Sequence, residues 1–171
     1  MSLQPCRPSP AHTQSALELV NEAPAHAAEI EALLDRAFGP GRFAKVSERV
    51  REFADFAPEL SFCALEAGKV VGVVRMWRVA AGGQPIVFLG PLAVEASERS
   101  HGLGARLVER ACQASAAAGE TAVVLVGDAP YFKRVGFAVA PDVALPGPVD
   151  PARILVRSFD SAPVRGMIQP R

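Results

Sequence analysis

The chain has little of two features that mark nucleic-acid-binding proteins, namely aromatic side chains and a surplus of positive charge. Only 6% of its 171 residues are aromatic, and its 18 basic residues are balanced by 18 acidic ones. Few aromatic rings leave little surface on which bases can stack. A net charge of zero gives no overall attraction to nucleic acid or to an anionic membrane. We therefore expect no nucleic-acid partner and a small partner instead.

Cysteine pairs, long apolar runs and a signal sequence are also missing. The three cysteines, Cys6, Cys63 and Cys112, lie far apart and form no Cys-x-x-Cys pair, so the sequence offers neither a zinc site nor a redox motif. No apolar run approaches the ~20 residues needed to cross a membrane, and the first residues lack the basic-then-apolar pattern of a signal peptide. This cysteine usage fits a reducing compartment. These absences predict a cytoplasmic protein with no metal and no membrane association.

What the sequence does contain is the mixture of helical and strand patterns typical of one α+β domain with a mixed sheet. Residues 1–14, with Pro5, Pro8 and Pro10, predict a disordered Pro-rich tail, residues 15–160 a single domain, and residues 161–171 a C-terminal tail. Ala67-Gly68 is expected to form a tight hairpin turn, and Ser47 to cap a helix. Strands are expected at residues 17–19, 61–66, 69–79, 86–94, 121–126, 137–139 and 153–159, and helical segments at 25–38, 47–56, 102–118 and 130–135.

The most informative segment joins the predicted strand at residues 86–94 to a helix that begins at Gly102. Gly102 and Gly104 stand at that helix start, where backbone N–H groups have no intrahelical partner and the helix dipole is positive. Glycine lets the backbone approach a bulky anion, so the segment predicts a phosphate or pyrophosphate site. The pattern lacks the third small residue of a Rossmann loop and the Gly-Lys-Ser/Thr ending of a Walker loop. Close packing of the helix is the alternative explanation of the two glycines.

Two motifs in this part of the chain resemble those of the GNAT superfamily of N-acetyltransferases. Arg99-Ser100-His101-Gly102-Leu103-Gly104 is similar to its acetyl-CoA loop, Gln/Arg-x-x-Gly-x-Gly/Ala, and follows Gly90-Pro91-Leu92-Ala93-Val94, which looks like the family's fourth strand. Tyr131-Phe132-Lys133-Arg134-Val135-Gly136-Phe137 is similar to the segment after the fifth strand that runs from a tyrosine to Gly-Phe. The resemblance covers about residues 17–159. It implies a three-layer α+β fold, with a mixed, mostly antiparallel sheet of six to seven strands flanked by helices.

The resemblance also implies a function, an acetyl-CoA-dependent N-acetyltransferase that moves the acetyl group to a primary amine by direct attack. By the same resemblance Tyr131, the only tyrosine, protonates the departing thiolate as general acid. A base for the amine is sought in Glu95 or Asp128, the nearest carboxylates in the sequence, and Asp128 is equally suited to cap a helix. The expected cofactor contacts are the pyrophosphate loop, Arg99, Ser100, His101, Gly102, Leu103, Gly104, Ala105 and Arg106, and the strand edge that accepts the pantetheine arm, Leu92, Ala93 and Val94.

The chain departs from the familiar family pattern in ways that bear on the acceptor. Ser100 replaces the usual glycine after the leading arginine, and residues 126–131 lack the Asn-x-x-Ala spacing of many members. The chain looks more like a bacterial branch with a Pro-rich C-terminal extension. The acceptor is expected to be a small-molecule or peptide amine that binds near residues 25–56, and a homodimer is left open. The alternative function is a sensor or assembly module that binds CoA or acyl-CoA without catalysis.

Overall fold

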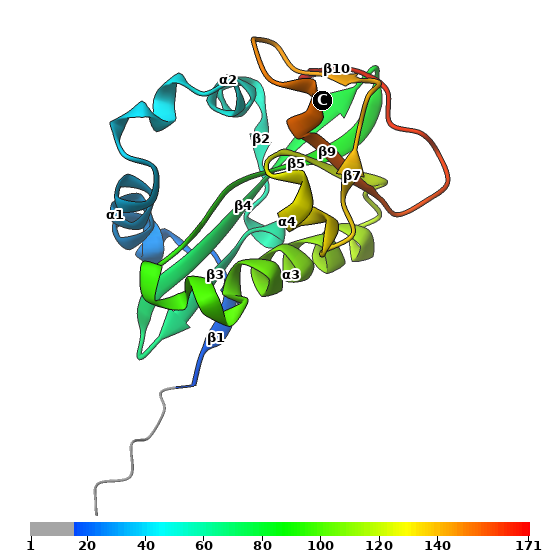
Figure 1. Cartoon of the computed structure of the whole chain (residues 1–171). Coiled ribbons are helices and arrows are strands. Elements are labelled where there is room, and N and C mark those ends of the chain that lie inside the picture. The colour runs from blue at the N-terminus through cyan, green and yellow to red at the C-terminus, as the bar shows by residue number, and fades with distance from the viewer. Residues whose placement is uncertain (1–15) are drawn as a thin grey trace, which may run out of the picture.

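The computed structural model describes residues 16–171 and shows one sheet with helices on both of its faces (Figure 1). Residues 1–15, which include the expected N-terminal tail, lie outside the described part of the chain. The helices are α1 (Ala27–Phe38), α2 (Val46–Phe53), α3 (Leu103–Ala117) and α4 (Ala129–Lys133). The strands are β1 (Glu18–Asn21), β2 (Asp55–Phe56), β3 (Phe62–Glu66), β4 (Lys69–Ala81), β5 (Gln84–Val94), β6 (Ala122–Val126), β7 (Ala138–Val139), β8 (Val143–Ala144), β9 (Ile154–Ser158) and β10 (Gly166–Gln169).

The sheet is mixed and mostly antiparallel, which confirms the expected fold. Its main path runs β1-β3-β4-β5-β6-β9-β7, seven strands, and each neighbouring pair on that path is antiparallel except β5 and β6. The hairpin between β3 and β4 turns at Ala67 and Gly68, whose φ angles are 49° and 76°. A two-residue turn of the I′ type needs positive φ at both central positions, so the predicted turn is confirmed.

The two faces of the sheet are covered by different helices because side chains alternate along each strand. On β4, Val74 packs with the apolar stripe of α3, and its neighbour Val73 packs with α1 on the opposite face. The α3 stripe is the one that helical spacing indicates, and all of its members are buried: Leu103, Leu107, Val108, Ala111 and Cys112. Cys63 belongs to the α1 side. Burial raises the pKa of both Cys63 and Cys112 to about 12, so neither thiol ionises near neutral pH.

The C-terminal segment differs from the expected tail, because residues 166–169 form β10. This strand pairs antiparallel with Ala80 and Ala81 of β4, and parallel with the short strand β8. Its Ile168 is buried in the apolar cluster that also contains Ile86. Only four residues long, β10 is too short to show an alternation in the sequence, and its partners lie far away along the chain. The sequence therefore gives no local signal of this strand.

The segment between α1 and β3 also differs in detail from the expectation. The second helix begins at Val46, with Lys45 at its N-cap and no side-chain capping bond, so Ser47 lies inside the helix rather than capping it. The same helix ends at Phe53, and β2 follows because its two residues pair with Trp77 and Arg78 of β4. Long-range pairing thus replaces the last turn of the expected helix.

The burial of Ile168 leads to a prediction about the C-terminal strand. Ile168 is 1% exposed, whereas the preceding Met167, on the other face of the same strand, is 47% exposed. Ile168→Ala should lower the free energy of unfolding by about 2–5 kcal/mol because it leaves a cavity in the core. Met167→Ala, the matched control, should change it by less than about 0.5 kcal/mol. Urea unfolding of both variants measures this, and equal effects would show that β10 does not belong to the cooperative core.

Candidate active site

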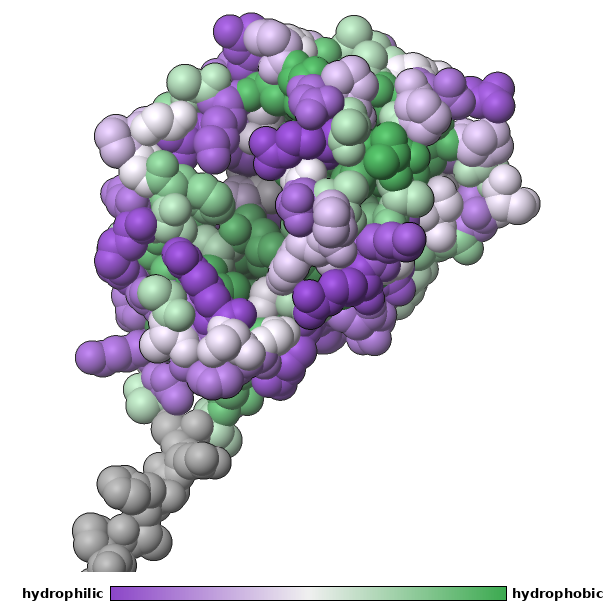
Figure 2. Space-filling view, in the orientation of Figure 1, coloured by the Kyte–Doolittle hydropathy of each residue, from purple (hydrophilic) through white to green (hydrophobic). Residues whose placement is uncertain are grey.

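The site begins where two parallel strands separate. β5 and β6 pair at only two positions, Val87 with Val123 and Phe88 with Val124, although β5 continues to Val94. A cavity of about 520 Å³ lies beside the separated part of β5, between residues 88–92 and the end of β6. Residues 44–47, at the start of α2, and residues 148–150 line other parts of the cavity. In Figure 2 the hollow has an apolar interior and a hydrophilic rim.

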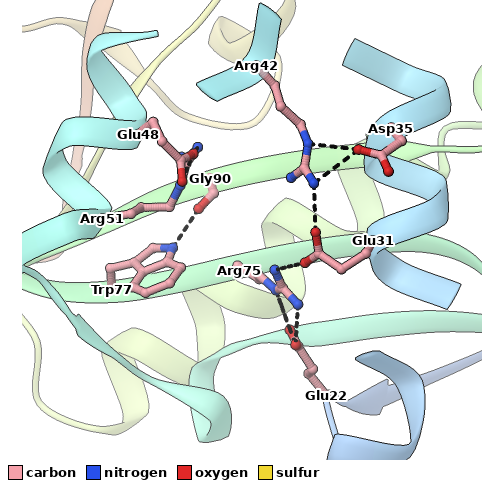
Figure 3. Close-up of polar contacts among 9 residues, drawn as sticks. All are labelled: Glu22, Glu31, Asp35, Arg42, Glu48, Arg51, Arg75, Trp77 and Gly90. Carbon is pink, nitrogen blue, oxygen red and sulfur yellow. Dashed lines mark hydrogen bonds and ion pairs between the residues drawn. The ribbon is translucent and has the colours of Figure 1, made fainter. Parts of the chain in front are cut away.

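A bulge shapes the cavity wall formed by β5. Leu92 pairs with Val74 of β4, and Leu89 pairs with Met76, so Gly90 and Pro91 bulge out of the regular ladder. The indole Nε1 of Trp77 donates a hydrogen bond of 2.6 Å to the Gly90 carbonyl oxygen (Figure 3). Since this carbonyl has left the ladder, the indole satisfies it from inside the protein. Glycine followed by proline within a strand pattern is the sequence signal of such an irregularity.

The predicted phosphate loop lies at the start of α3. Gly102 has φ 71° and ψ 16°, the left-handed conformation that glycine adopts without strain, and the first turn of the helix carries no acidic residue. Arg99 and His101 belong to the preceding 3₁₀ turn, Ala96–His101. Arg99 Nε donates to the Val94 carbonyl at 3.5 Å, and His101 Nδ1 lies 3.5 Å from Glu98. The helix dipole and the guanidinium of Arg99 favour an anion at this place.

The two motifs found in the sequence meet in space at Gly104. A Cβ atom placed on Gly104 would lie 2.5 Å from the hydroxyl oxygen of Tyr131 and 3.7 Å from a Val94 methyl. Only glycine therefore lets Tyr131 approach the first turn of α3 this closely. Tyr131 is not among the residues that line the cavity; its hydroxyl points toward α3 instead. Burial raises the pKa of Tyr131, opposed by the smaller effect of Arg134, so the phenol is protonated at neutral pH.

The two candidate bases have different surroundings. Asp128 lines the cavity, and its Oδ2 accepts a hydrogen bond of 3.1 Å from the backbone N–H of Tyr131, so Asp128 is the N-cap of α4. Glu95 does not line the cavity, and its carboxylate forms an ion pair with Arg36 of α1. The structure thus places Asp128 next to the cavity and Glu95 beside α1.

Several basic residues around the cavity were not singled out as site residues by the sequence motifs. Its charged lining residues are Arg42, Lys45, Arg51, Asp128, Asp150 and Arg153. Arg51 is largely buried and donates to Glu48 through Nε, at 3.1 Å, and through Nη2 (Figure 3). The spacing of Glu48 and Arg51 indicates a helical ion pair, but no local pattern indicates a cavity beside it. These residues come from distant parts of the chain, so only the fold brings them together.

An ion-pair network fixes the segment that covers one side of the cavity. Arg75 of β4 donates to Glu22 at 2.8 Å and to Glu31 of α1 at 3.0 Å, and Arg42 donates to Glu31 at 2.7 Å and to Asp35 at 3.1 Å (Figure 3). Burial raises the pKa of Glu31, but the hydrogen bonds from Arg42 and Arg75 outweigh it, and the net shift is downward. Glu31 therefore stays ionised and joins α1 to β4 and to the 3₁₀ turn Pro40–Ala44.

The described part of the chain offers neither a metal cluster nor a membrane span. Across residues 16–171, no group of three or more His, Cys, Asp or Glu side chains is arranged to hold a metal ion. No helix among the same residues has both the length and the apolar composition needed to span a membrane.

Comparisons with known proteins agree with the fold and with the family that the sequence resembles. Residues 27–138 match the sequence profile of the acetyltransferase (GNAT) family. The uncharacterized N-acetyltransferase YhbS of Escherichia coli K12 is 34% identical over 122 residues, which are 70% of this chain and 72% of YhbS. The uncharacterized N-acetyltransferase YjhQ of the same strain is 32% identical over 127 residues, 71% of this chain and 70% of YjhQ.

Solved structures extend the likeness to nearly the whole chain. The crystal structure of E. coli YhbS in complex with CoA superposes with a TM-score of 0.77 at 28% identity, covering 94% of this chain and 93% of YhbS. A GNAT family acetyltransferase from Brucella melitensis in complex with acetyl-CoA gives a TM-score of 0.70 at 25% identity, covering 92% of this chain and 97% of that one. The family profile and the relatives above 30% identity show that this chain belongs to the GNAT family of acetyltransferases.

Proposed function

We propose that this chain binds acetyl-CoA and transfers its acetyl group to a primary amine by direct attack. The observation that carries the proposal is the meeting of Tyr131 with Gly104 beside the strand edge where β5 has left β6. Two similar structures contain CoA or acetyl-CoA, which supports the same cofactor here. In this proposal the start of α3 binds the phosphates of the cofactor, the free edge of β5 binds its pantetheine arm, and the phenol of Tyr131 protonates the leaving thiolate.

The loop at the start of α3 would hold the phosphates of the cofactor. The backbone N–H groups of residues 101–105 stand at the positive end of the helix dipole, and Arg99 and Arg106 add positive charge. The edge of β5 at Leu92, Ala93 and Val94 would pair with the amide groups of the extended pantetheine arm. Arg99 already donates to the Val94 carbonyl, so we expect the arm and Arg99 to compete for that acceptor.

The transfer itself needs one proton delivered and one removed. The amine nitrogen forms a bond to the acetyl carbon while the carbon–sulfur bond breaks, and the electron pair of that bond goes to the sulfur. We assign Tyr131 as the acid that protonates the sulfur, because its hydroxyl is protonated at neutral pH and stands beside the start of α3. Of Glu95 and Asp128 we favour Asp128 as the base for the amine, since it alone lines the cavity.

The proposed phosphate loop predicts a specific effect at Gly102. This residue has φ 71°, and no atom lies within 4 Å of the place that an alanine Cβ would take, so alanine would strain the backbone without a clash. Gly68, in the distant β3–β4 turn, has φ 76° and equally open surroundings, which makes it a matched control. Both alanine variants should lose about 1 kcal/mol of stability. Only Gly102→Ala should weaken binding of CoA in calorimetry, by about tenfold or 1.4 kcal/mol. If both variants bound CoA equally well, the loop at Gly102 would not be the phosphate site.

The assignment of Tyr131 predicts a loss of turnover without a loss of binding. Tyr131→Phe should lower kcat by about 100-fold, because general acid catalysis contributes roughly that much, and should leave the Kd of CoA unchanged. Burial raises the pKa of Tyr131 above its usual value of about 10. Tyr131 should therefore stay protonated below about pH 10, and its deprotonation should not reduce the wild-type rate in that range. Release of CoA with a panel of amines measures kcat and its dependence on pH. A variant with unaltered turnover would refute the assignment.

The same assay separates an enzyme from a module that only binds CoA. If wild-type protein binds CoA and acetylates no amine, the non-catalytic alternative is favoured. If it binds neither CoA nor acetyl-CoA, both functions are excluded.

The two candidate bases can be compared with variants that preserve their structural contacts. Asp128→Asn keeps a good N-cap for α4, since asparagine caps helices as well as aspartate does, and Glu95→Gln keeps a hydrogen-bond acceptor toward Arg36. If Asp128 is the base, its variant should lower kcat/KM by about 100-fold or more while Glu95→Gln has little effect. The reverse order would assign Glu95, and two unaffected rates would show that water receives the proton.

A further inference from the structure

We propose that the acceptor amine carries an anionic group, a carboxylate or a phosphate, which binds among Lys45, Arg51 and Arg153 in the cavity beside β5. The inference rests on the proposed acetyl transfer and names the class of its acceptor. All three residues line the same cavity of about 520 Å³. They come from the start of α2, from the body of α2, and from the 3₁₀ turn Pro151–Arg153.

Basic residues outnumber acidic ones in the lining of the cavity, which has Arg42, Lys45, Arg51 and Arg153 against Asp128 and Asp150. Asp128 caps α4, and Asp150 accepts a hydrogen bond of 3.0 Å from the backbone N–H of Ala152. Each of these carboxylates is directed to a helix start rather than to a cation of the cavity. Arg42, in contrast, is neutralised from outside by Glu31 and Asp35. Of the other lining cations, Lys45 and Arg153 form no ion pair within the described residues, and Arg51 pairs with Glu48 through one edge of its guanidinium only.

Of the three residues, Arg51 is the one whose guanidinium is fixed by a carboxylate. Its side chain is 11% exposed, and Glu48 accepts from its Nε and Nη2 atoms. Its other terminal nitrogen, Nη1, lies 3.6 Å from the place that a Cβ would take on Gly90 of the β5 bulge. Across residues 16–171 this Nη1 has no hydrogen-bond partner within the protein. A guanidinium fixed on one edge presents its remaining N–H groups in a defined direction, which suits a carboxylate or phosphate oxygen.

Lys45 and Arg153 approach the cavity from two separate segments. The Nζ of Lys45 lies 4.8 Å from the ring centre of Phe38, a cation–π contact that does not cancel its charge. Arg153 Nε donates to the Gly127 carbonyl at 3.4 Å. No ion pair joins either residue to a carboxylate within the described part of the chain. Two exposed cations at the rim and one buried cation inside it therefore surround the same apolar space.

The apolar lining indicates what connects the anionic group to the amine. Phe88, Leu89, Pro91, Leu125 and Phe132 form much of the cavity wall between the cations and the separated strands. A hydrocarbon segment is the part of an acceptor that such a wall would bind. The acceptor class that fits is thus an amine and an anionic group joined by an apolar body.

Matched acceptors test the charge requirement directly. With acetyl-CoA as donor, leucine is compared with leucinamide, 6-aminohexanoate with hexylamine, and 3-aminopropyl phosphate with propylamine. The anionic member of at least one pair should have a kcat/KM at least tenfold above its neutral partner. The carboxylate and phosphate pairs distinguish the two kinds of anion. If neutral amines react as well as their anionic partners throughout, the inference is wrong while the proposed acetyl transfer stands.

Variants then test the residues. Lys45→Met and Arg153→Met should each raise the KM of the preferred anionic amine by about tenfold, with little change in kcat, in the KM of neutral amines or in the Kd of CoA. Lys69→Met, at an exposed lysine at the start of β4 and outside the cavity lining, is the matched control. If the two substitutions raised the KM of neutral and anionic amines equally, Lys45 and Arg153 would have a structural role in their segments and would not bind the anionic group.

A binding measurement keeps the test independent of turnover. Calorimetry compares N-acetylleucine with N-acetylleucinamide, and 6-acetamidohexanoate with N-hexylacetamide, on protein saturated with CoA. Tighter binding of at least one anion, lost in Lys45→Met and Arg153→Met, supports the anion site even if no amine is acetylated. If no amine is acetylated and the wild type binds the anionic and the neutral product analogues equally, the proposed anion site is wrong. Failure to bind CoA at all would instead contradict the proposed function, and the comparison would then be made on the protein alone.

Discussion

The early separation of β5 from β6 is the constraint on which the whole site depends. Two paired positions join β5 to β6, and beyond Phe88 the edge of β5 on the β6 side has no neighbouring strand, although its other edge continues to pair with β4. Backbone N–H and C=O groups need hydrogen-bond partners, and side chains of the protein bond to two carbonyl groups of this part of β5. Trp77 satisfies the Gly90 carbonyl and Arg99 reaches the Val94 carbonyl. In the proposed function, the remaining groups of this edge pair with the extended pantetheine arm by strand addition.

The second constraint is the close contact between α3 and Tyr131. Gly104 removes the one side chain that would keep the phenol away from the helix. Asp128 fixes the start of α4 one turn before Tyr131, so the cap sets the direction from which the phenol arrives. Burial then keeps the hydroxyl in its protonated form. Gly104, the Asp128 cap and the burial of Tyr131 thus hold a protonated phenol beside the start of α3, where we propose that the phosphates bind.

The parts of this site that could be predicted from the sequence are those with local patterns. The stripe on α3 follows helical spacing, the turn at Ala67 follows hairpin chemistry, and the cap at Asp128 precedes a proline in the first turn of its helix. The loop at Gly102 and the segment at Tyr131 were recognisable as two short motifs. Their contact through Gly104, however, depends on how α3 and α4 pack, which no pattern within either motif describes.

The parts that could not be predicted depend on pairs of distant segments. β10 forms because residues 166–169 find the edge of β4, and four residues show no usable periodicity. The cations of the cavity are similar: Lys45 and Arg153 are ordinary exposed residues in the sequence and share a cavity only after the C-terminal segment has folded onto the sheet. Charge counted along the chain sums to zero, so the composition conceals a local surplus that the fold creates.

The distribution of charge also bears on how the amine loses its proton. The ammonium group of the proposed acceptor lies at the other end of the apolar wall, in the same cavity as Lys45, Arg51 and Arg153, and both poor solvation and these like charges lower its pKa. The carboxylate or phosphate of the acceptor binds to the three cations, and this attraction offsets the repulsion between the cations and the ammonium group. The amine nitrogen then needs only a weak base to become neutral. A carboxylate engaged in capping, such as Asp128, or a water molecule beside it meets that requirement, so the site has no need of a separate strong base.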